Sequence, residues 1–169
     1  MSAIHIADIG LVVAMGKPSN TRYQAVRQFA RHNAITFVLP ERVYDELSVD
    51  DLDGWTPPIE MAIEEGWATV AEPLDFSRSI VSRAMDGVQR YIGNTNDRPA
   101  DEVERANGAL AALGAQQLST GVVTEASIYT TDIAAGEAAE TVLVSNGYGD
   151  SVVFVNGFRF IDNLRAADS

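Results

Sequence analysis

The chain has 169 residues, of which 12 are basic and 24 acidic, giving a formal net charge of −12, and it contains no cysteine. This length predicts one domain over residues 1–169, and the absence of cysteine excludes disulfides and thiolate metal sites. No apolar run approaches the roughly 20 residues of a membrane span, and the N-terminus lacks the features of a signal peptide, so we expect a soluble, cytoplasmic protein without membrane contact.

Strands and helices are predicted to alternate along the chain. Short runs of β-branched and aromatic residues predict strands, and apolar residues recurring every three or four positions predict amphipathic helices. Pro40 suits the first position of a helix, where its missing N–H costs nothing. In the first half we expect a strand over 4–6 that leads with the apolar residues 11–13 into a loop, a helix over 21–32, a strand over 35–39, a helix from Pro40, a short helix over 59–65 and a strand over 68–70. In the second half we expect helices over 76–91 and roughly 100–117, a strand over 124–129, a helix over 133–145, a strand over 152–155, and an apolar strand or short helix over 158–164.

This alternation predicts an α/β fold, a single-domain α/β/α sandwich with a mostly parallel central sheet. The glycines form neither a phosphate-binding loop nor a dinucleotide fingerprint, and no Gly-x-Ser-x-Gly segment occurs. The two histidines, His5 and His32, do not have the spacing of a metal site or a catalytic triad. Function therefore has to be sought in the acidic residues.

Acidic residues follow three of the predicted strands. Asp8 follows the first strand, Glu46 lies in the helix after the second, and Asp132 follows the strand over 124–129. In an open parallel sheet, residues that leave the carboxyl ends of the strands converge on one crevice. Carboxylates gathered there repel one another unless a hard cation such as Mg²⁺ or Mn²⁺ lies between them. The pattern predicts a metal-dependent phosphodiesterase site.

Each of these acids also has a simpler structural explanation. Asp8 at a strand end can cap a turn through its carboxylate, and Asp132 before a helix is a good N-cap whatever its chemistry. Glu46 can be an ordinary solvated helix residue. The occurrence of three acids, in order, at three strand ends favours the metal site over three separate structural roles.

The order and spacing of these segments resemble the PIN domain, a metal-dependent nuclease fold that includes toxin ribonucleases and RNA-processing endonucleases. The resemblance spans nearly the whole chain and is closest to the haloarchaeal variety. It is carried by Gly16-Lys17-Pro18-Ser19-Asn20, by Phe37-Val38-Leu39-Pro40-Glu41-Arg42-Val43-Tyr44-Asp45-Glu46-Leu47, by Tyr129-Thr130-Thr131-Asp132 and by Val153-Phe154-Val155-Asn156-Gly157-Phe158.

The resemblance implies that Asp8, Glu46 and Asp132 bind one or two Mg²⁺ or Mn²⁺ ions. It places Asn107 at the fourth acidic position, so the implied catalytic set is these four residues. Asn107 keeps an oxygen ligand but lacks the negative charge, which weakens cation binding. Glu104, three residues earlier on the same helix face, could partly compensate as a metal ligand.

The chain departs from the family pattern directly after Asp8. Family members usually have a hydroxyl residue and then a small polar residue, whereas this chain has Ile9 and Gly10. Those polar groups would support the first aspartate and the water on its metal, so we expect a weakened support of that carboxylate.

The segment from residue 17 to residue 42 is basic within an acidic chain. It contains five basic residues and one acid, Glu41. These basic residues could form a phosphate-binding surface, and the alternative is a solvated basic helix face. The expected RNA-binding residues are Lys17, Arg22, Arg27, Arg31 and Arg42.

The acidity of the whole chain has an environmental interpretation. Lys17 is the only lysine among the 12 basic residues. Few lysines with many Asp and Glu are typical of proteins from salt-loving archaea, in which molar salt screens the repulsion of an acidic surface. An ordinary acidic bacterial protein is the alternative. If the protein is halophilic, its net charge does not argue against a nucleic-acid partner.

Two functions follow as hypotheses. The first is a PIN-like Mg²⁺- or Mn²⁺-dependent endoribonuclease that cleaves RNA and is weakened by Asn107. The second is a catalytically degenerate PIN domain that binds RNA or a protein without cutting. A small-molecule phosphatase ranks last because no nucleophile motif is present. The expected partners are RNA, an antitoxin-like protein, and a second copy of the chain in a homodimer through the apolar segment 152–164.

Overall fold

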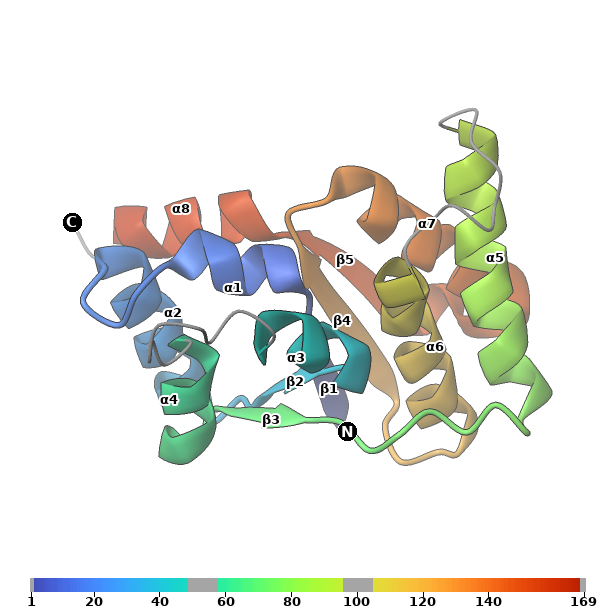
Figure 1. Cartoon of the computed structure of the whole chain (residues 1–169), viewed down its shortest axis with the longest axis horizontal. Coiled ribbons are helices and arrows are strands. Elements are labelled where there is room, and N and C mark those ends of the chain that lie inside the picture. Colours follow the sequence, from blue (N-terminus) through green and yellow to red (C-terminus); the bar gives the residue numbers. More distant parts are fainter. Residues whose placement is uncertain (1, 49–57, 96–104, 168–169) are drawn as a thin grey trace.

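The computed structural model describes residues 2–48, 58–95 and 105–167. Its centre is a five-stranded parallel sheet with strand order β3-β2-β1-β4-β5 (Figure 1). The predicted α/β class and parallel sheet are confirmed. The strands are β1 (Ala3–Ala7), β2 (Phe37–Leu39), β3 (Ala68–Val70), β4 (Glu125–Thr130) and β5 (Val152–Asn156).

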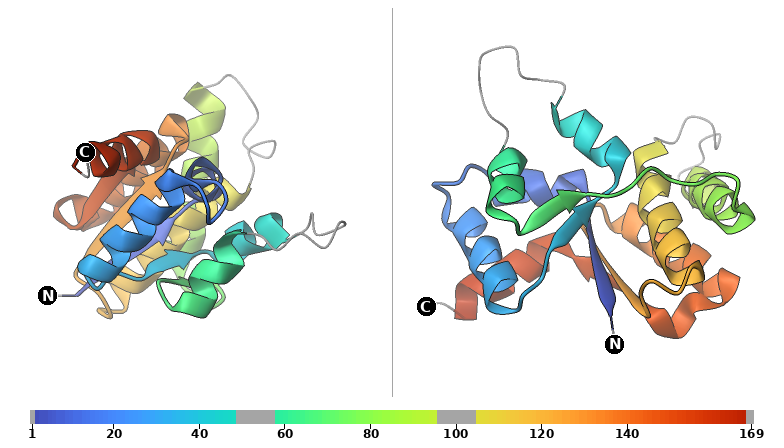
Figure 2. Two further views of the ribbon diagram at one scale, coloured as in Figure 1. Left: turned by 90° about the vertical axis from the view of Figure 1, so that its left-hand side faces the viewer. Right: turned by 90° about the horizontal axis from the view of Figure 1, so that it is seen from below.

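Helices cover both faces of this sheet (Figure 2). None of them, within the described residues, combines the length and apolar character that crossing a membrane would need. The 21–32 helix has the predicted bounds. The helices are α1 (Ile9–Met15), α2 (Thr21–His32), α3 (Glu41–Ser48), α4 (Pro58–Glu65), α5 (Ser79–Thr95), α6 (Arg105–Ser119), α7 (Ile133–Leu143) and α8 (Gly157–Ala167).

Each face of the sheet has its own apolar core, because successive strand residues point to opposite faces. Ile6 and Ile128 are fully buried against α5, α6 and α7. Phe37 and Tyr129 are buried on the other face, against α1, α2, α3, α4 and α8. The sheet is therefore covered on both sides, as expected for parallel strands.

The order of the strands creates one topological switch point. From β1 the chain builds outward to β2 and β3, and it then crosses back to place β4 on the other side of β1. Connections from these two neighbouring strands diverge at their carboxyl ends. In open α/β sheets ligands bind in the crevice formed there, so the ends of β1 and β4 are the place to look for a site.

The segment after β1 differs from the sequence expectation. A strand leading into a loop was predicted there, but Ile9–Met15 forms the helix α1. Asp8 caps this helix by accepting the backbone N–H of Ile9, and Leu11, Val12 and Met15 are buried along one side. A short apolar run cannot be assigned to strand or helix from its periodicity alone, and the cap decides the outcome.

Other expectations need smaller corrections. Pro40 precedes α3 and does not occupy its first position, and its carbonyl accepts the N–H of Tyr44 at 3.1 Å. The 133–145 helix ends at Leu143 and continues as a wider turn through Gly147, which has a positive φ of 93°. The C-terminal segment, left between strand and helix, is the helix α8.

Candidate metal centre

Asp8 is a buried carboxylate at the switch point. It follows β1 directly, caps α1 and is only 2% exposed. Its Oδ1 accepts the N–H of Ile9 at 2.8 Å, and its Oδ2 accepts the hydroxyl of Thr130 at 2.7 Å. The Asp8 N–H donates to the Tyr129 carbonyl at 3.0 Å, which extends the pairing of β1 with β4. These bonds fix the orientation of the carboxylate at this edge of the sheet.

Thr130 connects Asp8 to the end of β4. It is the last residue of that strand and is completely buried. Besides donating to Asp8, its Oγ1 accepts the N–H of Asp132 at 3.1 Å. One hydroxyl therefore ties together two of the acidic positions predicted from the sequence, and it provides a hydroxyl beside Asp8, where Ile9 has none.

Asp132 lies at the surface, at the same edge of the sheet. Its side chain is exposed, and its Oδ1 accepts the N–H of Ala135 at 3.1 Å, so Asp132 is the N-cap of α7. The simpler structural explanation of this residue is thus correct as far as it goes. A carboxylate has about four acceptor positions, and capping by one oxygen is compatible with metal ligation.

The turn that carries Asp132 is held by two glycines. A Cβ on Gly10 would lie 2.1 Å from Oγ1 of Thr131, and a Cβ on Gly157 would lie 2.9 Å from its Cγ2. Either distance is below any normal contact, so only glycine fits at both positions unless Thr131 moves. Gly10, which departs from the family pattern, is therefore required by the packing of this chain.

Helix α6 packs on the sheet, and Asn107 lies in its first turn. Two helical turns later, a Cβ on Gly114 would lie 3.8 Å from Ile6 of β1 and 3.9 Å from Ala126 of β4. Because α6 leads into β4 through a short connection, it runs opposite to the strands. Its start, with Asn107, therefore lies toward the carboxyl ends of β1 and β4, about 10 Å beyond Gly114.

Glu46 lies on α3, which packs against α1 and α6. Helix α3, the start of α1 and the start of α6 gather in one region of the molecule (Figures 1 and 2). The side chains of Glu46 and Asn107, and the whole of Glu104, lie outside the described part of the structure. Their elements nevertheless reach the edge at which Asp8 lies.

The donor chemistry of this edge fits a hard cation. The residues at it offer carboxylate, amide and hydroxyl oxygens, which are ligands of Mg²⁺ and Mn²⁺. Among side chains that the structure describes, no three His, Cys, Asp or Glu residues come together as a metal site. The described residues supply Asp8 and Asp132 at this edge, and Glu46 and Asn107 remain predicted ligands.

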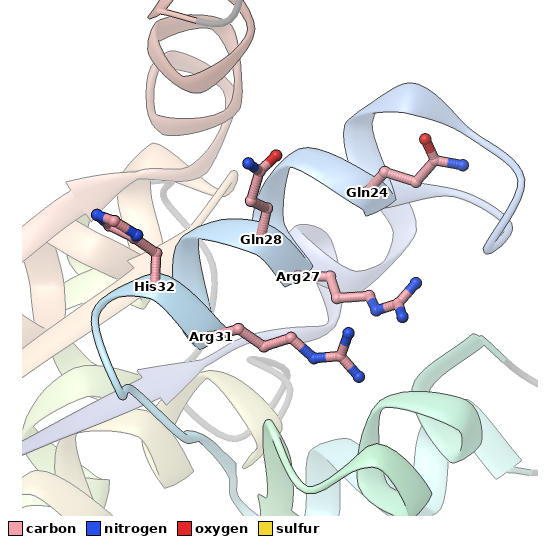
Figure 3. A pocket seen from close by; sticks show the side chains of 5 residues that line it. All are labelled: Gln24, Arg27, Gln28, Arg31 and His32. Atoms are coloured by element: carbon pink, nitrogen blue, oxygen red, sulfur yellow. The ribbon is translucent and has the colours of Figure 1, made fainter.

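The predicted RNA-binding residues are spread over several parts of the surface. Arg27 and Arg31 line an open pocket of about 510 Å³ along α2 (Figure 3). Both approach Oε2 of Glu65, with the Nε of Arg27 at 3.0 Å and an Nη of Arg31 at 2.6 Å. Only the Arg31 contact also has hydrogen-bond geometry. One carboxylate therefore already offsets part of this basic pair.

The position of this basic pair is also distant from Asp8. Helix α2 runs into β2, so its last turn with Arg31 lies toward the amino ends of the strands. Arg22 lines a different pocket between α1 and α8, Arg42 lines a third beside α3, and Lys17 is exposed in the loop before α2. Of the five cations, Arg42 lies on the element that also carries Glu46.

A histidine and a tyrosine pair beneath the site. The Nδ1 of His5 lies 2.9 Å from the hydroxyl of Tyr129, and both rings pack in an aromatic cluster with Phe37. Burial lowers the pKa of His5 below 6.5 and raises the pKa of Tyr129 to about 12. Both side chains are therefore neutral at pH 7.

This pair predicts a pH dependence of stability. The unfolded chain takes up a proton on His5 near pH 6.5, whereas the folded chain takes it up at lower pH. The contribution of His5 to the free energy of unfolding is therefore complete above about pH 6.5 and is lost as the pH falls below it. We expect His5→Gln to flatten the stability profile between pH 5 and 7. Urea unfolding across this range measures it, with His32→Gln, at an exposed position, as the control. Equal slopes for His5→Gln and wild type would contradict the assignment.

Comparison with known proteins supplies one match. A family model described as the halobacterial PIN domain matches residues 1–169. No curated protein and no solved structure gives a significant match. The matched range includes Asp8, Thr130 and Asp132, together with the elements that carry Glu46 and Asn107.

Proposed function

The chain belongs to the halobacterial PIN domain family, and on this premise we propose that it is a Mg²⁺- or Mn²⁺-dependent endoribonuclease that hydrolyses RNA phosphodiester bonds. The observation that carries this proposal is the pair Asp8 and Asp132, joined through the buried hydroxyl of Thr130 at the switch point of the sheet. The hydrogen bonds from Ile9 and Thr130 make burial of this carboxylate tolerable without a metal, so support for a metal comes from the position of Asp8. Its placement at the ligand-binding edge of an α/β sheet supports a metal-binding role.

The residues divide into ligands and supports. Asp8, Glu46 and Asp132 would hold the cation, with Asn107 adding an amide oxygen and Glu104 a further carboxylate. When bound, such an ion lowers the pKa of a water and offsets charge on the phosphate. Thr130 and the Ile9 N–H orient the Asp8 carboxylate, and the first turn of α7 fixes the backbone at Asp132.

The alternative function is a degenerate PIN domain that binds RNA or a protein without cutting. Asn107 favours it, because an amide removes one of the charges that would attract a divalent cation. The acidic composition with a single lysine supports a halophilic protein, so both functions should be tested in molar KCl.

The two functions are separated by Asn107→Asp. We expect wild type to cleave RNA with Mn²⁺ and to stop in EDTA, and the variant to bind Mn²⁺ about tenfold more tightly because a full charge replaces a dipole. The measurements are RNA cleavage on gels and calorimetric Mn²⁺ titration of both proteins. Cleavage by Asn107→Asp alone would show that the natural chain is a degenerate PIN domain. Cleavage by neither protein would contradict the proposed endoribonuclease activity.

The exposed apolar surface between α1 and α8 supports binding of a protein partner. Val13 and Phe158 are 68% and 58% exposed and line one pocket of about 240 Å³ between α1 and α8. Exposed apolar side chains that lie together mark association surfaces. This surface includes part of the apolar segment 152–164 and supports the proposed homodimer, and an antitoxin-like protein could use the same chemistry.

A further inference from the structure

A second pocket lies beside α3 and has mixed chemistry. Its volume is about 260 Å³, close to the lower end of the range for small-molecule sites. Apolar side chains form part of the lining and charged side chains the rest. Its residues are Pro40, Glu41, Arg42 and Asp45 around the start of α3, Pro73, Leu74 and Phe76 after β3, Met85 of α5 and Ala109 of α6.

Phe76 is an exposed aromatic ring on a fixed turn at this pocket. Its side chain is 49% exposed. The preceding residue, Asp75, donates its N–H to Oε1 of Gln116 at 2.7 Å and accepts the N–H of Ser77 at 3.0 Å. The Phe76 carbonyl accepts the hydroxyl of Ser82 at 3.1 Å. Because the backbone on both sides is tied down, little further conformational freedom is lost when a ligand covers the ring.

The polar lining complements the edge of a nucleobase. Every base carries both hydrogen-bond donors and acceptors on its edge. Arg42 can donate to the acceptors, and the carboxylates of Glu41 and Asp45 can accept from the exocyclic amines. A flat ring stacked on Phe76 would therefore meet both kinds of partner in the same pocket. A base in a duplex has its edge paired and its faces stacked, so only an unpaired base fits.

The pocket borders helix α3, which also carries Glu46 of the proposed metal centre. Arg42 and Asp45 of α3 line it, and Glu46 follows Asp45 and lies one turn from Arg42. The turn with Phe76 lies nearer the end of α6 than its start, because the N–H of the residue before Phe76 donates to Gln116 in the last turn of that helix. The segment after β3 passes α6 on its way to α5 (Figure 2). Helix α3 is therefore the element that would connect a base in this pocket to a phosphate at the metal centre.

The charge of the chain favours contacts with RNA that do not rely on phosphates. At a net charge of −12, the protein as a whole repels RNA at low salt, and at high salt the phosphate contacts lose their counterion-release contribution. Stacking of a base on an aromatic ring contributes about 1–3 kcal/mol, and it does not need a positive surface. Such a contact therefore suits RNA binding by this acidic chain.

We infer that the pocket formed by α3, Phe76 and α6 is a base-binding subsite, in which Phe76 stacks on an unpaired nucleobase of single-stranded RNA and Arg42 binds its edge. The inference rests on the proposal that RNA is the substrate, and it names single-stranded RNA as the form that binds. Phe76 and Arg42 are binding residues and take no part in the bond cleavage.

Phe76→Ala tests the subsite by its effect on binding. The probe is a fluorescein-labelled 12-nucleotide RNA, single-stranded or annealed to its complement, titrated in molar KCl with EDTA so that no cleavage occurs. We expect the Kd of wild type for the single strand to rise about 5- to 100-fold in Phe76→Ala, the range that loss of one stacked base gives, and to be restored by Phe76→Tyr. Val144→Ala, at an apolar residue after α7 with nearly the same exposure (50%), should leave the Kd unchanged.

The outcomes separate the subsite from the nuclease function. An unchanged Kd in Phe76→Ala, an equal loss for duplex, or no saturable binding by wild type would overturn the subsite. Cleavage is scored separately with Mn²⁺. If wild type cleaves while Phe76→Ala binds normally, the nuclease proposal stands and the subsite is wrong. If Phe76-dependent binding occurs in EDTA but wild type never cleaves with Mn²⁺, the subsite stands and the nuclease proposal fails.

Discussion

Asp8→Asn is expected to remove Mn²⁺-dependent RNA cleavage, with a loss of more than about 10²-fold, and to leave the fold intact. A direct ligand should matter more than the partners that orient ligands, whose removal already costs about 10- to 100-fold. The substitution keeps the shape of the side chain and one oxygen that can accept the Ile9 N–H, so α1 keeps its cap. It removes the only charge of a residue that is 2% exposed.

The same change should not lower stability when the metal is absent. A buried carboxylate carries a desolvation penalty of several kcal/mol that a neutral amide largely avoids, and the asparagine oxygen can still accept the Ile9 N–H. We therefore expect Tm in EDTA to be unchanged or higher, by roughly 2–4 °C for each kcal/mol gained in a chain of this length. Lost function together with retained stability is the signature of a residue kept for its chemistry.

Three proteins decide this prediction: wild type, Asp8→Asn and Asp86→Asn, whose aspartate is exposed on α5. Calorimetric Mn²⁺ titration and RNA cleavage are measured in molar KCl, and thermal unfolding is measured in EDTA. The control should match wild type in all three. Asp8→Asn that binds Mn²⁺ and cleaves like wild type would exclude Asp8 as a ligand, and a strong fall in Tm would make it a structural residue.

The strand and helix pattern could be predicted because it depends on local chemistry. The helix over 21–32 has an Asn20 cap and apolar residues at helical spacing, and both survive into the structure. The prediction for the segment after Asp8 was wrong, because three apolar residues in a row fit a strand, a buried helix or a loop equally well. Its helix depends on the cap from Asp8 and on burial of Leu11 and Met15, and burial is a property of the fold and not of the segment.

The site could be predicted only in part, for a similar reason. Asp8 and Asp132 were predicted to lie at one edge because strand ends converge, and in the structure both contact Thr130 at that edge. The role of Thr130 was missed although Thr130-Thr131-Asp132 was singled out. Its hydroxyl matters through the register that pairs Ala7 with Tyr129 and so places Thr130 beside Asp8. Register between strands 122 residues apart cannot be deduced from one sequence.

A count of charges along the basic segment leaves out acidic residues that fold against it from elsewhere in the chain. Arg27 and Arg31 share a helix face as predicted, but Glu65 from α4 lies against both. A carboxylate 34 residues beyond Arg31 is invisible to a local charge count. The direction of α2 relative to the strands cannot be deduced from the charge count either. The helix would steer phosphates to the site only if it ran toward the carboxyl ends of the strands.

Thr130→Val is expected to weaken both the fold and the metal site. The valine fills the same space but lacks the hydroxyl, so the Asp8 Oδ2 loses a donor and the Asp132 N–H loses an acceptor. Leaving such groups unsatisfied in a buried position costs about 1–3 kcal/mol. Mn²⁺ affinity should fall about 10- to 100-fold, because the carboxylate is no longer held in one orientation.

Thr130→Ser distinguishes the hydroxyl from the packing. Serine keeps the hydroxyl and loses a buried methyl group, at a cost of about 1 kcal/mol. Both variants should therefore unfold at lower urea concentrations than wild type, but only the valine variant should lose Mn²⁺ affinity in calorimetry. If both lose Mn²⁺ affinity in proportion to their stability, Thr130 acts through the fold alone. If neither does, the hydroxyl does not position Asp8 for a metal, and the link between the ends of β1 and β4 is purely structural.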